Sequence, residues 1–310
     1  QCQIGWPDCC CCKQIKMSKI CVIGDVNADI VSLLREPLQA NSDTQTSNSI
    51  NLGGSPCNMS MWLATTKADV NFLAAIGDDL LGQWISEQLS AGNLDASNLQ
   101  IISGSRSGTC IILVGQDGQR TMLPDPAANL HFKLGQSETE LINSSSVVVM
   151  STYSFLRPET RALALDVAKL VQNNSARFVL DAASSAPIAE VGVDLVRQYL
   201  LQADLILANE DEFALLDHPD WTSQVSDLVV KQGPLGAKWL RFGQEVCQVA
   251  AKEVQVLDTT GAGDSFLAGL ISVLVEHSDW FAISDADRSA ALERGAQIAA
   301  INISKVGAGP

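Results

Sequence analysis

The chain lacks the features of a membrane-spanning protein and of a nucleic-acid-binding protein. None of its apolar runs reaches the roughly 18 residues that a membrane helix requires. Basic residues are scarce: 20 Lys and Arg stand against 35 Asp and Glu, for a formal net charge of −15. Neither nucleic acid nor an anionic membrane surface is therefore expected as a partner. A phosphorylated ligand stays compatible with this charge, because backbone N–H groups and Mg²⁺ can hold a phosphate locally.

The nine cysteines do not form the pattern of a disulfide framework. Five of them fall within the first twelve residues, and the other four, Cys21, Cys57, Cys110 and Cys247, lie separately in or near apolar stretches. This distribution favours buried thiols in a reducing compartment, so a cytoplasmic location is expected.

The first 16 residues, QCQIGWPDCCCCKQIK, lack the apolar segment of a secretory signal. They are either an unstructured extension or a metal-binding tract. We favour the extension, because no His or second Cys cluster completes a spaced metal site. The folded domain is therefore expected to span residues 17–310.

From Met17 on, short apolar runs alternate with helical patterns. Strands are expected at 19–24, 70–75, 147–150, 177–180 and 204–208, and helices at 54–68, 79–90, 158–172, 187–201, 264–277 and 286–305. Strand–helix–strand units of this length predict an α/β fold, a three-layer α/β/α sandwich with a mostly parallel central sheet.

Two stretches, about residues 29–51 and 108–123, interrupt this alternation. The first lacks helical periodicity, and the second reads as two strands joined at Asp117-Gly118, a strong hairpin signal. We expect them to form a small β-sheet lid over the carboxyl edge of the central sheet.

The most informative string is LDTTGAGDSF, residues 257–266, a glycine-rich turn that leads into an apolar helix. The backbone N–H groups of Gly261, Ala262 and Gly263 can form an anion-binding nest at the helix N-terminus. A carboxylate at Asp264 would repel a bound phosphate, but it could take a proton from an attacking hydroxyl. An ordinary helix start is the alternative, and it would be preferred for a bare GxGD but not for the whole string.

The whole string resembles the second signature of the ribokinase-like (PfkB) carbohydrate kinases, and the resemblance extends from Met17 to Gly309. The segment GGSPCN, with Gly53, Gly54 and Asn58, resembles the first signature, which implies contacts with a sugar. The alternative for these three residues is an ordinary loop and helix start.

The segment GDVNAD resembles the family's N-terminal segment, whose Asn and Asp hold sugar hydroxyls; here these residues are Asn27 and Asp29. Alternate residues of an extended segment point the same way, so both side chains could face one ligand. A polar loop after a strand is the alternative.

Further motifs imply a nucleotide and Mg²⁺. Asn209 and Glu212, in NEDE, resemble the N-x-x-E motif that organises Mg²⁺ through water, although an acidic helix start has the same pattern. Asp181 follows another apolar run, and it either approaches this region or caps its strand. Gly233 and Gly236, in GPLG, resemble the turn that lines the nucleotide.

The C-terminal segment KVGA, with Gly307, resembles the turn near adenine and a monovalent-cation site. The resemblance also implies that Asp258 and Thr260 help to bind K⁺ or Na⁺. The chain departs from ribokinases proper at Tyr153, near the place of a ribose-contacting glutamate, and at Ser55, in place of a lysine. The resemblance therefore implies kinase chemistry without specifying ribose.

These motifs together predict ATP-dependent phosphorylation of a primary hydroxyl of a small sugar. Asp264 would be the general base and the backbone of residues 261–263 the anion hole, with ATP and Mg²⁺ as cofactors and the lid as a surface for a homodimer. Two alternatives stay open: a nucleoside kinase of the same family, and a non-catalytic regulator that binds a sugar or nucleotide on the same fold. The intact Asp264 speaks against the regulator.

Overall fold

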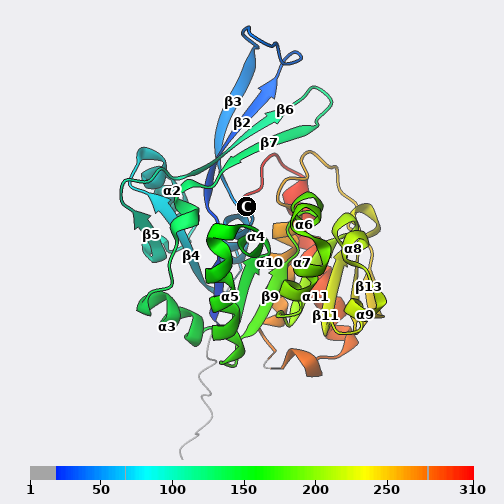
Figure 1. Ribbon diagram of the computed structural model, residues 1–310. Coiled ribbons are helices and arrows are strands. Elements are labelled where there is room, and N and C mark those ends of the chain that lie inside the picture. Colours follow the sequence, from blue (N-terminus) through cyan, green and yellow to red (C-terminus); the bar gives the residue numbers. More distant parts are fainter. Residues whose placement is uncertain (1–18, 67, 278) are drawn as a thin grey trace, which may run out of the picture.

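A computed structural model describes residues 19–66, 68–277 and 279–310, and the cysteine-rich residues 1–16 lie outside the described residues. The centre of the described chain is a nine-stranded sheet with the order β13-β12-β11-β10-β9-β8-β1-β4-β5 (Figure 1). The strands from β11 to β5 run parallel, and β12 and β13 continue the sheet antiparallel at one edge. The bounds are β1 Lys19–Ile23, β4 Asp69–Gly77, β5 Leu99–Ile102, β8 Val147–Ser151, β9 Arg177–Asp181, β10 Leu205–Asn209, β11 Asp227–Lys231, β12 Ala237–Arg241 and β13 Gln244–Val249.

Helices cover both faces of this sheet, which confirms the predicted three-layer sandwich. In β1, Ile20 and Val22 enter one core and Cys21 and Ile23 enter the other, so that every second residue faces the same layer. One face packs against α1 Ser55–Ala64, α2 Leu80–Ala91, α10 Ala262–Leu274 and α11 Asp285–Ile303. The other packs against α3 Gln136–Ser144, α4 Tyr153–Leu156, α5 Pro158–Gln172, α6 Ser185–Val191, α7 Val193–Leu200, α8 Glu210–Leu216 and α9 Pro219–Thr222.

The prediction of a single helix at 187–201 is wrong in one respect, because the segment is divided into α6 and α7. Gly192 separates the two helices with a φ of 109°, which is outside the helical region and is accessible to glycine at little cost.

A second, four-stranded sheet stands apart from the central one, at the top of Figure 1. Its order is β3-β2-β6-β7, with β2 Asn27–Leu34, β3 Thr46–Gly53, β6 Gly108–Val114 and β7 Arg120–Asp125. Its strands start at Asn27 and end at Asp125, slightly outside the expected ranges. We call this sheet the lid.

The base of the lid is fixed by the buried side chain of Asn129. Its Oδ1 accepts a hydrogen bond from the backbone of Val26 at 3.0 Å, and its Nδ2 donates to Val26 O at 3.1 Å and to Asn27 Oδ1 at 3.0 Å. The start of β2 is thereby tied to the segment that follows β7.

Within the described ranges, no helix combines the length and the apolar character needed to cross a bilayer. Cys21, Cys57 and Cys110 are buried free thiols, as expected from their apolar surroundings in the sequence. Cys247 is also a free thiol, but it is only partly buried, because it lies on the edge strand β13.

Candidate active site

Two glycine turns bring the N-termini of α1 and α10 together at the carboxyl edge of the sheet. Gly261, which precedes α10, has a φ of 74°, and a Cβ there would lie 2.7 Å from the Cβ of Ala308. Gly54, which precedes α1, has a φ of 93°, and a Cβ there would lie 2.4 Å from the carbonyl oxygen of Asp25. Both turns therefore require glycine, both for φ and for close approach.

Asp264, in the first turn of α10, is held by side chains from the first turn of α1. Ser55 Oγ donates to Asp264 Oδ1 at 2.6 Å, and Asn58 Nδ2 donates to Oδ2 at 2.9 Å. Burial raises the pKa of Asp264 to about 6, even though both hydrogen bonds favour the charged carboxylate. A carboxylate with this pKa is suited to accept a proton near neutral pH.

Asp29, on β2 of the lid, faces the same region. Its carboxylate lies against Gly53, where a Cβ would come within 2.1 Å of the carboxylate atoms. Burial, and secondly the charge of Asp264, raise the pKa of Asp29 to about 7. Among the described residues, its buried Oδ1 has no hydrogen-bond partner. A buried carboxylate oxygen without a protein donor is a candidate ligand group.

Asn209 and Glu212 bind each other at the start of α8. Asn209 Oδ1 accepts from the backbone N–H of Glu212 at 2.9 Å, and Glu212 Oε2 accepts from that of Asn209 at 2.8 Å. Asn209 Nδ2 also donates to Glu212 Oε1 at 2.6 Å. Burial, followed by the charge of Asp181, raises the pKa of Glu212 to about 7. Glu212 thus orients Asn209 and adds negative charge near the site.

Lys231, the last residue of β11, is a site residue that the sequence analysis did not single out. Its Nζ forms an ion pair with Asp181 Oδ2 at 3.0 Å, and a Cβ on Gly263 would lie 3.0 Å from this ammonium. A lysine at a strand end usually indicates a solvent-exposed position. The only signal in the sequence was its place two residues before Gly233.

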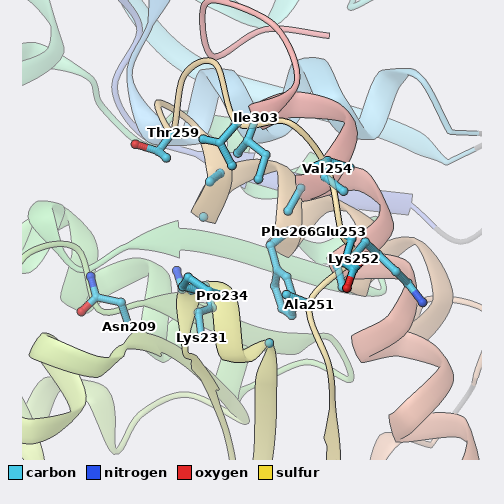
Figure 2. A pocket seen from close by; sticks show the side chains of 18 residues that line it. Asn209, Lys231, Pro234, Ala251, Lys252, Glu253, Val254, Thr259, Phe266 and Ile303 are labelled. Carbon is cyan, nitrogen blue, oxygen red and sulfur yellow. The ribbon is translucent and has the colours of Figure 1, made fainter. Parts of the chain in front are cut away.

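A cavity of about 560 Å³ opens beside the N-terminus of α10. Figure 2 shows Asn209 and Lys231 on one side of it and the segment 251–254 on the other. Its volume is typical of a small-molecule site, and a helix N-terminus at its wall favours an anionic group. The apolar part of its lining would suit a planar base: Pro234, Ala251, Val254, Val256, Phe266, Ala296, Ala299, Ala300 and Ile303.

The predicted site residues fall into three groups. Asp264, Asn58, Asp29, Gly53 and Gly54 converge around the two carboxylates, with Asn27 at the adjoining end of β2. Ala262, Gly263, Asn209, Gly233 and Gly236 line the cavity, and Gly261 caps the helix at its wall. The third group lies where two segments meet: Asp258 and Thr260 precede α10, and Gly307 follows α11.

Where these two segments meet, the Asp258 carboxylate already accepts several hydrogen bonds. It accepts from the N–H and Oγ1 of Thr260 at 2.8 and 2.7 Å and from the N–H of Gly307 at 3.0 Å, and it pairs with Arg120 of the lid. Burial alone would raise its pKa, but these donors outweigh burial and lower it. The carbonyl of Thr260 accepts from Asn302 Nδ2 at 2.7 Å. Each of these oxygens therefore has at least one hydrogen-bond donor, and Arg120 places a positive charge directly beside Asp258.

The residues around Lys231 fit Mg²⁺ held through water, not a cage of protein ligands. Within the described part of the chain, no group of three or more His, Cys, Asp or Glu is placed to hold a metal ion directly. Asp181 raises the pKa of both Glu212 and Asp264, so this edge of the sheet carries an excess of negative charge. Mg²⁺ usually keeps several of its waters and needs few direct carboxylate ligands.

The chain is similar to known proteins over nearly its whole length. Residues 17–310 match the model of the pfkB family of carbohydrate kinases. A ribokinase from Haemophilus influenzae is 23% identical over 302 residues, covering 93% of this chain and 92% of that protein. A probable fructokinase-7 from Arabidopsis thaliana is 25% identical over 240 residues, covering 72% of this chain and 69% of that protein.

Solved structures show the same fold. The adenosine kinase of Sinorhizobium meliloti superposes with a TM-score of 0.79 at 18% identity, covering 95% of this chain and 96% of that one. The Arabidopsis thaliana ribokinase complexed with ribose and ATP gives a TM-score of 0.77 at 20% identity, covering 94% and 96%. With the family model matched over nearly the whole length, the chain belongs to the pfkB family of carbohydrate kinases.

Proposed function

We propose that this kinase transfers the γ-phosphoryl group of ATP to a primary hydroxyl of a small sugar. The bond between the γ-phosphorus and its bridging oxygen breaks, and a bond forms to the sugar oxygen. ADP leaves with the electron pair of the broken bond, and Asp264 takes the hydroxyl proton. The observation that carries the proposal is the position of Asp264, which lies at the N-terminus of α10 between the Asp29 region and the nucleotide-sized cavity.

The chain's own groups account for the other parts of the reaction. The N–H groups at the start of α10 would stabilise the transferred phosphoryl group. Asp29 and Asn58 would orient the sugar, and the lid would exclude water and so limit ATP hydrolysis. Mg²⁺, held through water near Asn209 and Glu212, would neutralise phosphate charge when bound.

The test is a coupled assay of ADP release on a panel of pentoses, hexoses, keto-deoxy acids and nucleosides. A sugar that stimulates ADP release at least about tenfold over the sugar-free rate, with a phosphorylated product seen by mass spectrometry, supports the proposal. Stimulation by nucleosides alone would identify a nucleoside kinase instead. Tight binding of a sugar without ADP release would indicate a non-catalytic regulator.

The hydrogen bond from Ser55 should set the acid limit of the reaction. Ser55→Ala removes a donor that favours the charged form of Asp264, so the pKa of Asp264 should rise above about 6. Because the base must be deprotonated, the acid limb of the kcat–pH profile should move to higher pH, with a loss of roughly threefold near pH 6 and little change at pH 8. Ser90→Ala, on the exposed surface of α2, is the matched control, and an unmoved limb in Ser55→Ala would contradict this role.

Arg120 should make the enzyme independent of monovalent cations. We propose that its guanidinium supplies the positive charge beside Asp258 that K⁺ or Na⁺ was expected to supply. Turnover should then be the same in potassium and tetramethylammonium salts at equal ionic strength. Activation of the unaltered protein by K⁺ over a titration series would refute this role.

The lid is proposed as the interface of a homodimer. Ile50, Ile30, Ile111 and Leu123 are cross-strand neighbours in one row, and Ile50, Ile111 and Leu123 are 51%, 42% and 51% exposed. An exposed apolar row on one sheet face favours association with an identical row. Analytical ultracentrifugation should show a dimer that Ile111→Asp converts to a monomer, and a monomeric unaltered protein would exclude this interface.

A further inference from the structure

Lys231 extends across the carboxyl end of β10 and forms an ion pair with Asp181, the last residue of β9. Its strand, β11, neighbours β10, and β10 neighbours β9, which ends at Asp181. The ion pair between Lys231 and Asp181 is largely withdrawn from water, since the two side chains are 17% and 13% exposed. Removing one partner of such a pair leaves the other charge unbalanced, so a test of Lys231 also requires a variant in which Asp181 is neutralised.

The position of the ammonium is unusual for a purely structural lysine. Nζ lies 3.0 Å from the place of a Cβ on Gly263, in the first turn of α10. The N-terminus of a helix carries partial positive charge and disfavours a cation. Burial also works against the charge of Lys231, but Asp181, Glu212 and Asp264 outweigh it and raise the pKa of the lysine. The lysine therefore stays charged and also lines the cavity.

A cation and a helix N-terminus that face the same space form a binding place for a doubly or triply charged oxyanion. We propose that Lys231 is a catalytic residue whose ammonium contacts the transferred phosphoryl group. This inference rests on the proposed function and adds a residue to it. The lysine gives up no proton: it offsets the negative charge on the phosphoryl oxygens while the bond to ADP breaks and the bond to the sugar oxygen forms.

The proposed contact predicts that Lys231 affects the binding of a triphosphate more than the binding of ADP. A lysine that touches only the transferred group should distinguish a triphosphate from ADP. If Lys231 only neutralises Asp181, its removal should affect both nucleotides alike. Calorimetric titration with β,γ-imido-ATP and with ADP, each with Mg²⁺, separates these two roles without requiring turnover.

Three variants make the test. Lys231→Met keeps the aliphatic stem and removes the charge, and Lys231→Arg keeps the charge. The double variant Lys231→Met with Asp181→Asn removes both charges, so it remains usable if the single variant does not fold. Melting temperature reports the structural effect of each variant.

In Lys231→Met we expect affinity for β,γ-imido-ATP and kcat each to fall roughly tenfold to a hundredfold, with much less change for ADP. The double variant should recover thermal stability but not the preference for the triphosphate, and Lys231→Arg should keep most of that preference. An equal loss for both nucleotides, or an unaltered preference in the double variant, would overturn the assignment. If no acceptor in the panel is phosphorylated, the proposed function fails, but the nucleotide titrations still decide the role of Lys231.

Discussion

Replacing Asp264 by Asn is expected to lower turnover by about 10²–10⁴-fold, the usual contribution of a general base. The change preserves the shape of the side chain, and its amide oxygen can still accept from Ser55 or Asn58. What it removes is the capacity to accept the hydroxyl proton. The fold and the binding of ATP should therefore persist, as measured by melting temperature and by calorimetric titration of the nucleotide.

The control for this variant is Asp43→Asn, which changes an exposed carboxylate of the lid in the same way. It should retain the turnover of the unaltered protein. Near-normal turnover in Asp264→Asn, with the true acceptor in hand, would remove Asp264 as the base. A variant that no longer bound ATP would instead show that the carboxylate organises the nucleotide site.

Replacing Asp29 by Ala should raise the KM for the sugar by at least about tenfold and leave the KM for ATP nearly unchanged. The Oδ1 of Asp29 has no hydrogen-bond partner in the protein and can accept from a hydroxyl, and a hydrogen bond to a charged group contributes about 1.5–3 kcal/mol. Turnover should fall as well, because a loosely held sugar presents its hydroxyl poorly to Asp264. Steady-state kinetics with each substrate varied in turn measure these effects.

Two further variants sharpen this result. Gly53→Ala should reproduce it, since the added methyl would displace the carboxylate that lies 2.1 Å from its position. Asp43→Ala should not, since it removes a carboxylate from an exposed part of the lid. Unchanged sugar kinetics in Asp29→Ala would place the residue outside the sugar site.

Strands β1, β4, β8, β9 and β10 could be predicted because burial on both faces gives them unbroken apolar runs, such as CVI in β1 and VVVM in β8. The buried strand β11 was missed, although it contains the apolar run LVV. The edge strands could not be predicted. In β13, Gln244–Val249, most residues are only partly buried or exposed, so no apolar run marks the strand. The antiparallel hairpin of β12 and β13 was missed for this reason.

In the candidate site, too, some features could be predicted from the sequence and others could not. The turn before Asp264 has a local signature, because its glycines are needed within four residues of the base. The contacts between distant segments have none: the sequence marked Asn58, but not its hydrogen bond to Asp264. Ser55 is 209 residues from Asp264, Arg120 is 138 from Asp258, and Lys231 is 50 from Asp181. Each of these contacts depends on tertiary packing that brings distant segments together, and a single sequence does not contain that information.

Asp29 and Asp264 belong to different bodies, since the first is carried by the lid and the second by a core helix. The charge of Asp264 that raises the pKa of Asp29 also exerts a force between them. Above pH of about 7 both carboxylates are ionised, and their mutual repulsion disfavours a closed lid. A sugar whose neighbouring hydroxyls donate to both would convert this repulsion into a bridge. At neutral pH this repulsion opposes the approach of the lid to α10, whereas the ion pair of Arg120 with Asp258 ties the lid to the core, and a bridging acceptor would tip this balance toward closure.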